Sequence, residues 1–387
     1  MHKTKTLTFL DNGNFSSIHK KKGLEERWFE SKKKFNDSIK LPGSTDTNEK
    51  GDKTLPWPED SITRQFTFPK DFENPKWIYE LNTAPSRKYK YIGPAWYQKE
   101  IQIPTNWENQ RAELFFERSL FKMQVWIDGN FIGEDIALYT PRRFDISDFV
   151  KPGEKHLLTI CIDNTNLIGG MAHSYTYHTQ TNWNGIMGSM EIRPHEQVSI
   201  KNTRIFTDIY DKNVRVETTV SNQSGTITPG KLLLQIKDKK GNILAEKTFQ
   251  RKFEKGDKTK ELYLDIQKPI TLWDEFTPEL YTAHLELITE DGKHFDTYTE
   301  NFGFRKIETS GSSILINDRP VFIRGTLDCA IYPKTGYMPM DRPSWERTLK
   351  TIKSYGMNHV RYHSVCPPKV AFEVADELGI YLQAELI

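Results

Sequence analysis

Short runs in which every second residue is apolar recur through the first half of the chain. Met123–Ile127 alternates apolar and polar residues, and Leu158–Ile162 repeats the pattern. This period of two predicts strands with one buried face, because side chains of a strand point alternately to its two sides. Asp128-Gly129 follows the first run and is typical of a hairpin turn. Strands are predicted at Thr63–Phe68, Trp96–Ile103, Ala112–Glu117, Lys122–Ile127 and His156–Ile162. Because no helical stretch separates them, residues 20–194 are predicted to form a β-sandwich of the jelly-roll type, after an N-terminal extension over residues 1–19.

A second group of strands is predicted between residues 195 and 306. The runs are Val214–Val220, Leu232–Ile236, Glu261–Ile266, His284–Ile288 and Phe295–Phe304. Turn sequences such as Lys240-Gly241-Asn242 and Asp291-Gly292 separate them. About seven strands in roughly a hundred residues indicate an immunoglobulin-like sandwich. No flexible linker is visible on either side, so the parts of the chain are expected to pack on one another.

The pattern changes over residues 307–387, where strands alternate with helices. Strands are predicted at Val321–Arg324, Asn358–His363 and Ile380–Leu386, and helices at Ser344–Tyr355 and Pro368–Leu378. Gly356 and Gly379 follow the two helices as stop signals. This order predicts a parallel α/β sheet. A sheet that ends on a bare third strand leaves an open edge. We therefore expect either that the parent protein continues or that the reading frame is truncated.

Charge and composition narrow the classes of partner. The formal net charge of +2 gives no indication of nucleic acid or of an anionic membrane as a partner. Glutamates interrupt the lysine-rich stretch Lys20–Lys34, which favours a solvated surface. No apolar run reaches the length of a membrane span. Met1–Phe15 lacks the apolar core of a signal peptide, which leaves the location of the protein open.

Metal and cofactor sites are not expected. The three cysteines are far apart and form no CxxC pair. Met171–His178 interleaves histidine and tyrosine, but His173 and His178 have no carboxylate or third histidine nearby, which disfavours a metal site. The nine tryptophans suit the cores of large sandwiches, and Trp96 and Trp183 are expected to be core residues rather than sugar platforms.

Several stretches, in a shared order from Leu41 to Ile387, resemble glycoside hydrolase family 2, the family of β-galactosidases, β-glucuronidases and β-mannosidases. The stretches are Ile39–Asp46, Gly93–Tyr97, Gln180–Gly188, Trp273–Tyr281, Phe302–Arg305, Leu315–Asn317, Phe322–Gly325, Met357–Arg361 and Asp376–Gly379. The resemblance implies two sandwiches followed by a (β/α)₈ catalytic barrel, of which this chain would hold the first three strands.

The resemblance also implies a retaining exo-β-glycosidase of the β-galactoside or β-glucuronide class. In that family two glutamates, at the ends of barrel strands four and seven, act as nucleophile and as acid/base. Both would lie beyond Ile387, so the chain alone is expected to be inactive. The partner would be a carbohydrate, with no cofactor, and the full-length protein could be a homo-oligomer. The family makes a periplasmic or secreted location plausible. Two alternatives remain open: a non-catalytic carbohydrate-binding sandwich protein, and the inactive product of a broken reading frame.

Two candidate substrate-binding residues follow predicted strands one and two. His363 loosely matches the family's Arg-x-x-His tract, in which a histidine donates hydrogen bonds to the sugar, but its spacing from Arg361 is one residue shorter. Its structural alternative is a histidine that caps a loop. Asp328 could accept hydrogen bonds from vicinal hydroxyls, or it could form a turn. The tract Thr326–Ala330 departs from that of many β-galactosidases, which puts galactoside specificity in doubt.

Two further candidates complete the predicted site. Glu385 lies near the end of the third strand, where barrel enzymes place their active sites. It could bind a sugar hydroxyl, or be a charge paired within the barrel. Arg324 could pair with barrel carboxylates, and a structural role is favoured for it.

Overall fold

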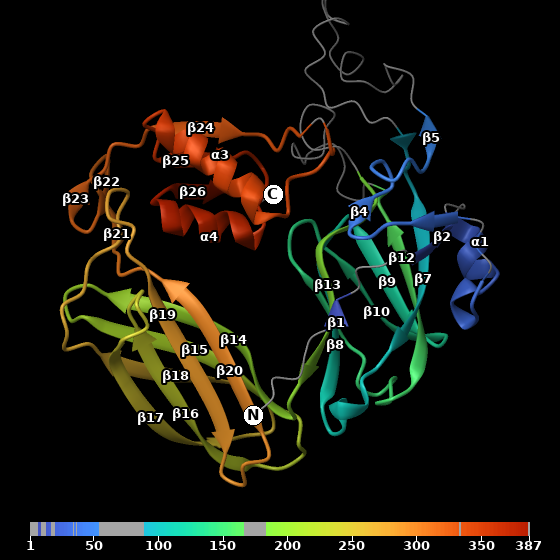
Figure 1. The fold of residues 1–387 in the computed structure, drawn as a ribbon, viewed down its shortest axis with the longest axis horizontal. Coiled ribbons are helices and arrows are strands. Elements are labelled where there is room, and N and C mark those ends of the chain that lie inside the picture. The colour runs from blue at the N-terminus through green and yellow to red at the C-terminus, as the bar shows by residue number, and fades with distance from the viewer. Residues whose placement is uncertain are drawn as a thin grey trace, which may run out of the picture.

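Two β-sandwiches and a smaller unit that contains two helices make up the part of the chain that can be described. The computed structural model describes residues 7–8, 13–16, 20–33, 35, 37–53, 89–165, 183–332 and 334–385. The helical unit lies above the second sandwich and beside the first (Figure 1). The predicted strand Thr63–Phe68 and the segment Met171–His178 lie outside the described residues.

The first sandwich consists of a six-stranded and a five-stranded sheet. The six-stranded sheet has the order β10 (Asn130–Ile136), β9 (Lys122–Ile127), β12 (Lys155–Asp163), β7 (Pro94–Gln102), β2 (Gly13–Ser16) and β3 (Asp37–Ile39). The other sheet has the order β1 (Leu7–Thr8), β13 (Gly185–His195), β8 (Arg111–Ser119) and β11 (Arg142–Asp145), and β4 (Gly43–Ser44) pairs with β13. Residues 7–8 and 13–16, assigned from the sequence to an extension, thus pair with strands of the sandwich.

Local sequence explains the hairpin and the covered face of this sandwich. Asp128 and Gly129 both have positive φ, 47° and 84°, as a tight turn between β9 and β10 requires. Trp96 is fully buried and stacks on Trp126, with ring centroids 5.4 Å apart. Helix α1 (Lys20–Glu25) covers this pair so closely that a Cβ on Gly23 would lie 2.3 Å from the Trp96 ring. Trp96 is therefore a core residue, as predicted.

The second sandwich has seven strands in two sheets. One sheet has the order β14 (Val198–Asp208), β15 (Asn213–Asn222) and β18 (Gly256–Asp265). The other has the order β17 (Ile243–Phe253), β16 (Thr228–Lys237), β19 (Tyr281–Thr289) and β20 (Phe295–Phe302). Alternate residues of β15 and β19 are buried, which is the pattern that the sequence showed.

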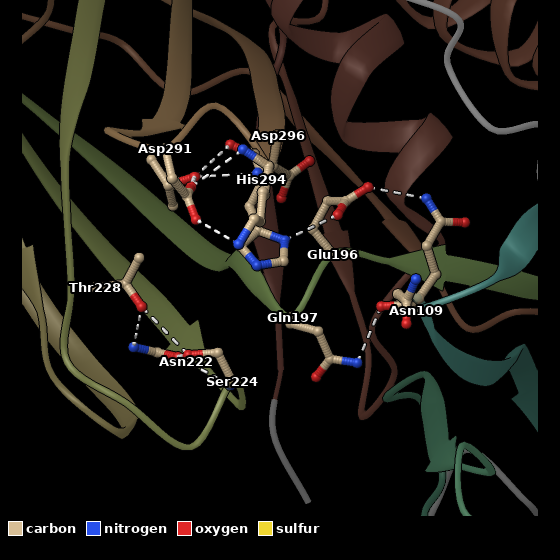
Figure 2. Close-up of polar contacts among 12 residues, drawn as sticks. Asn109, Glu196, Gln197, Asn222, Ser224, Thr228, Asp291, His294 and Asp296 are labelled. Atoms are coloured by element: carbon tan, nitrogen blue, oxygen red, sulfur yellow. Dashed lines mark hydrogen bonds and ion pairs between the residues drawn. The ribbon is translucent and has the colours of Figure 1, made fainter.

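Polar contacts hold the two sandwiches together at the end of β13 (Figure 2). His294 Nδ1 lies 3.1 Å from Glu196 Oε2, and Gln110 Nε2 donates to the other oxygen of Glu196 at 2.9 Å. Gln197 Nε2 donates to the carbonyl oxygen of Asn109. Side chains from three separate segments thus meet at this junction.

The helical unit begins with a small antiparallel sheet and continues as a parallel one. The small sheet contains β21 (Ile307–Ser310), β22 (Ser313–Ile316) and β23 (Arg319–Pro320). The parallel sheet has the order β24 (Gly325–Asp328), β25 (His359–Tyr362) and β26 (Tyr381–Ala384), connected by α3 (Arg342–Ser354) and α4 (Lys369–Leu378). The short elements η1 (Trp28–Glu30), β5 (Asp52–Lys53), β6 (Tyr89–Lys90) and η3 (Thr105–Trp107) complete the described structure. Among the helices described, none is long and apolar enough to cross a membrane.

The strand predicted at Val321–Arg324 is wrong by four residues. Phe322 is 77% exposed, and its carbonyl oxygen accepts a hydrogen bond from the Asn358 side chain rather than from a strand partner. The strand starts at Gly325, beside His359, where a Cβ would lie 2.5 Å from the imidazole. The apolar run therefore precedes the strand instead of forming it.

Candidate functional site

The parallel sheet brings three of the four predicted residues to one edge. Asp328 is the last residue of β24, and its register partner is Tyr362, the last residue of β25. Tyr362 is in turn paired with Ala384, at the end of β26. His363 and Glu385 are the next residues along the chain, so they follow the carboxyl ends of β25 and β26, at the same end of the sheet as Asp328. We call Asp328, His363 and Glu385 the strand-end cluster.

Asp328 is held in a turn and keeps capacity to accept further hydrogen bonds. Its Oδ1 accepts from the backbone N–H of Ala330 at 2.7 Å, and its Oδ2 accepts from the Tyr332 hydroxyl at 3.2 Å. The turn-forming role that was the structural alternative is thus present. Burial raises the pKa of Asp328 above its usual value. A carboxylate offers about four lone-pair positions, so each oxygen can still accept from a ligand hydroxyl.

Glu385 is fixed by two donors. Its Oε2 accepts from the backbone N–H of Ser364 at 2.8 Å, and its Oε1 accepts from Arg361 Nε at 2.5 Å. These contacts, the Ser364 hydrogen bond first and Arg361 second, lower the pKa of Glu385. Glu385 is therefore an ionised, oriented acceptor, and it is unsuited to donate a proton near neutral pH.

His363 lies between the ends of β24 and β25. Its backbone N–H donates to the carbonyl oxygen of Asp328 at 2.9 Å, which extends the pairing of the two strands by one residue. Its imidazole Nδ1 lies 3.6 Å from the Cys329 sulfur. Burial raises the pKa of the Cys329 thiol, so this cysteine stays protonated and is a poor nucleophile.

Arg324 does not belong to the strand-end cluster. It precedes β24 and therefore lies at the opposite edge of the sheet. Its Nη2 is 2.9 Å from Glu275 Oε2 in the segment before β19, and its Nε donates to the carbonyl oxygen of Gly356 at 2.7 Å. Arg324 therefore makes a structural pairing of the kind that was favoured for it, although its carboxylate partner, Glu275, belongs to the second sandwich and not to the parallel sheet.

Sequence reasoning missed two contacts that the first sandwich makes with the loop after β25. The Tyr139 hydroxyl donates to the carbonyl oxygen of Ser364 at 2.8 Å, and Arg118 Nη2 donates to that of Cys366 at 3.0 Å. Ser364 is the residue whose N–H holds Glu385. The first sandwich thus helps to position one side of the cluster. No local sequence pattern predicts hydrogen bonds between residues that lie more than two hundred positions apart.

No group of three or more metal-ligating side chains occurs within the described ranges of the chain. The cluster is instead a set of hydrogen-bonding groups: two carboxylates and an imidazole on three neighbouring strand ends. Such a set suits a polar ligand with several hydroxyl groups.

Comparison with known proteins identifies the family of the two sandwiches. Residues 10–187 match the sugar-binding domain of glycosyl hydrolases family 2, and residues 198–305 match a second domain of that family. The chain is 26% identical over 306 residues to a β-galactosidase of Thermoanaerobacter pseudethanolicus, covering 77% of this chain and 40% of that protein. It is 25% identical over 264 residues to a β-glucuronidase of Streptococcus agalactiae serotype V, covering 62% of this chain and 40% of that protein.

Solved structures share the fold along nearly the whole chain. A glycosyl hydrolase family 2 member from Bacteroides cellulosilyticus superposes with a TM-score of 0.76 at 17% identity, covering 99% of this chain and 46% of that one. A Ruminococcus gnavus β-glucuronidase in complex with uronic deoxynojirimycin gives a TM-score of 0.72 at 20% identity, covering 99% and 59%. The chain spans about two fifths of the length of the two relatives compared by sequence, the Thermoanaerobacter β-galactosidase and the Streptococcus β-glucuronidase. By its two matched domains, the chain belongs to glycoside hydrolase family 2.

Proposed function

We propose that this chain is the N-terminal part of a retaining exo-β-glycosidase that removes terminal β-linked sugars of the β-galactoside or β-glucuronide class from oligo- or polysaccharides. The observation that carries the proposal is the strand-end cluster, which places Asp328, His363 and Glu385 on neighbouring parallel strands in a family 2 chain. In this proposal β24, β25 and β26 are the first three strands of a (β/α)₈ barrel. Barrel enzymes carry their active sites on this carboxyl-end face.

The cluster would hold the sugar rather than break the bond. In this proposal Asp328 and Glu385 accept hydrogen bonds from hydroxyls, and His363 supplies an imidazole. Retaining hydrolysis further requires a nucleophile and an acid/base carboxyl about 5–5.5 Å apart. Glu385 is engaged by Arg361 and Ser364, so we assign it no catalytic role. The catalytic glutamates would be supplied by strands four and seven of the proposed barrel.

The test uses residues 1–387 and the polypeptide encoded by the whole gene side by side. With aryl β-galactosides and aryl β-glucuronides, we expect no turnover by residues 1–387. For the polypeptide that contains the remaining strands, we expect the β-anomer to be the first product. NMR identifies the anomer as it is released. Turnover by residues 1–387 alone, or an inverted first product, would overturn the proposal.

A non-catalytic glycan-binding protein is the second candidate. The observation in its favour is the match of residues 10–187 to a sugar-binding domain. Against it, the aromatic face around Trp96 and Trp126 lies beneath α1 and offers no open platform. Calorimetry on the chain carrying Asp328→Ala and Glu385→Ala separates the candidates. Unchanged affinity for sugars would favour binding on the first sandwich.

A further inference from the structure

A groove of about 690 Å³ runs between the first sandwich and the segment that leads from β24 to α3. The first sandwich contributes Met187 and Gly188, and the segment contributes Tyr332, Lys334 and Tyr337. Arg347, on α3, lines it as well. A Cβ on Gly188 would lie 2.2 Å from Glu117 Oε2 within the first sandwich and 2.8 Å from the Met340 side chain, so this glycine allows close contact on both sides. The groove is therefore formed by both units together.

Tyr332 connects the groove to the strand-end cluster. Its hydroxyl donates to Asp328 Oδ2 at 3.2 Å, and the same residue lines the groove. The groove and Asp328 are therefore separated by a single side chain, that of Tyr332.

Aromatic groups line the middle of the groove. Tyr337 lies against Trp183, with ring centroids 5.9 Å apart. Trp183 is only 2% exposed, and its indole N–H has no hydrogen-bond partner among the described residues. Buried indole N–H groups ordinarily have an acceptor. Tyr332 and Tyr337, which line the groove, offer aromatic faces that are suited to pack against a sugar ring.

The charged side chains of the groove favour one class of glycan, those that carry negative charge. Lys334 and Arg347 are exposed, and among the described residues neither makes an ion pair. The one acidic residue of the groove, Asp341, caps α3 by accepting from the Ser344 N–H at 2.9 Å. Among the lining residues the two cations thus exceed the one acid, while the Glu117 carboxylate behind Gly188 already accepts from the Ser189 N–H at 2.8 Å. The natural partners of the two cations are carboxylate or sulfate groups.

We propose that this groove binds an acidic sugar residue, bearing a carboxylate or a sulfate, in the same glycan whose terminal sugar occupies the strand-end cluster. The inference rests on the proposed function for the terminal sugar, and it adds a substrate class: anionic oligosaccharides. Lys334 and Arg347 bind the anionic group, and Tyr332 and Tyr337 contact the sugar rings.

The experiment measures binding of tetrasaccharides to the chain by titration calorimetry. Hyaluronan tetrasaccharide supplies uronate carboxylates, its methyl ester is the neutral counterpart, and a carrageenan tetrasaccharide supplies sulfates without uronate. We expect the acidic form to bind more tightly than the ester. The variant K334Q/R347Q should weaken binding of the acidic form roughly tenfold and leave the ester unchanged. Preference for the carrageenan over the hyaluronan fragment would identify the anion as sulfate.

The control is K239Q/K240Q, which removes the same charge from an exposed turn of the second sandwich. Three results would overturn the inference: no binding of either acidic tetrasaccharide, equal loss for the acidic form and the ester, or equal loss in the control. Hydrolysis of aryl glycosides by the whole gene product involves no second sugar. Failure of the groove would leave that hydrolysis intact, whereas failure of the proposed function would abolish it in every variant.

Discussion

Two carboxylates at the same end of the parallel sheet, Asp328 and Glu385, have opposite electrostatic settings. Burial raises the pKa of Asp328, whereas the Ser364 N–H and Arg361 lower the pKa of Glu385. A sugar hydroxyl that donates to either oxygen pair stabilises the charged form. The two settings also make opposite predictions for stability as a function of pH.

We predict that D328N gains stability relative to the natural protein as pH rises. The folded-state pKa of Asp328 lies above its unfolded value near 3.8, so the carboxyl ionises more readily in the unfolded chain. Its contribution to stability is full below that value and declines as pH rises through the folded pKa, and asparagine does not titrate. The difference is measured by denaturant unfolding from pH 3 to pH 7.

E385Q is the counterpart with the opposite sign. The folded pKa of Glu385 lies below its unfolded value of 4.5, so its contribution is present above pH 4.5 and is lost as pH falls through the folded pKa. The advantage of the natural protein over E385Q should therefore shrink on acidification. If the stability difference from the natural protein changed with pH in the same direction for D328N and E385Q, the assignment of the two environments would be contradicted.

Arg324 is predicted to stabilise the fold without contributing to sugar affinity. R324A removes the bond to Glu275, whose side chain is 9% exposed, and the bond to the Gly356 carbonyl. We expect a loss of about 1–3 kcal/mol in the free energy of unfolding and an unchanged dissociation constant for sugar. Arg319 is the matched control, since it pairs with the adjacent Asp274 but is 68% exposed. R319A should cost less than about 1 kcal/mol. Loss of sugar binding in R324A alone would return Arg324 to the site.

At the scale of elements, Gly379 joins the end of α4 to the second sandwich. Its φ is 70°, and a Cβ there would lie 2.8 Å from the carbonyl oxygen of Glu275. G379A should therefore lower the free energy of unfolding by about 1 kcal/mol because alanine is strained in the left-handed conformation. Displacement of the Glu275 contact should lower it by about 1–3 kcal/mol more.

Gly356 provides the matched control for this prediction. It follows α3 with a φ of 76°, and a Cβ there would meet nothing within 4 Å. G356A should lower the free energy of unfolding only by the cost of alanine in a left-handed backbone conformation. The additional decrease in G379A, measured by urea unfolding, therefore reports on the packing of α4 against the second sandwich. Equal losses would show that the contact with Glu275 contributes nothing.

Periodicity predicted the elements well wherever one face is buried against one core. The alternating run Lys122–Ile127 coincides with β9, and the helix predicted at Pro368–Leu378 corresponds to α4, which buries Ala371, Val374 and Ala375. Periodicity failed at Val321–Arg324, because hydrogen bonding to Asn358 rather than apolarity sets the start of β24.

The candidate site was predicted in part, for a related reason. Strand ends follow from the order of elements, which is why Asp328, His363 and Glu385 could be assigned to one end of the sheet, while their contact with a sugar stays a prediction. Tyr332 and Tyr139 were missed, since their roles depend on which side chain a loop carries toward the cluster. Arg324 makes the structural pairing that was favoured for it, but with Glu275 of the second sandwich, a partner that the order of elements does not predict.

At the scale of the molecule, the helical unit is held from two sides. The first sandwich contacts the loop after β25 through Tyr139 and Arg118. The second sandwich contacts α4 through Trp273, whose indole N–H donates to the Asp376 carbonyl at 2.7 Å. The geometry of the strand-end cluster therefore depends on both sandwiches, and the three parts should unfold together.

We predict that W273A uncouples the helical unit from the second sandwich. Trp273 is 1% exposed, and its ring lies 5.6 Å from that of Tyr381 on β26, so alanine leaves a cavity at the boundary and removes the bond to Asp376. The cost should be about 3–5 kcal/mol. Calorimetry should show a separate, earlier transition, and hydrogen exchange should rise in β24, β25 and β26. W107A, which removes a tryptophan of equal burial from the first sandwich, should raise exchange in β7 and β8 instead. If W273A still melts in one transition, with exchange raised evenly through the chain, the helical unit does not depend on this contact.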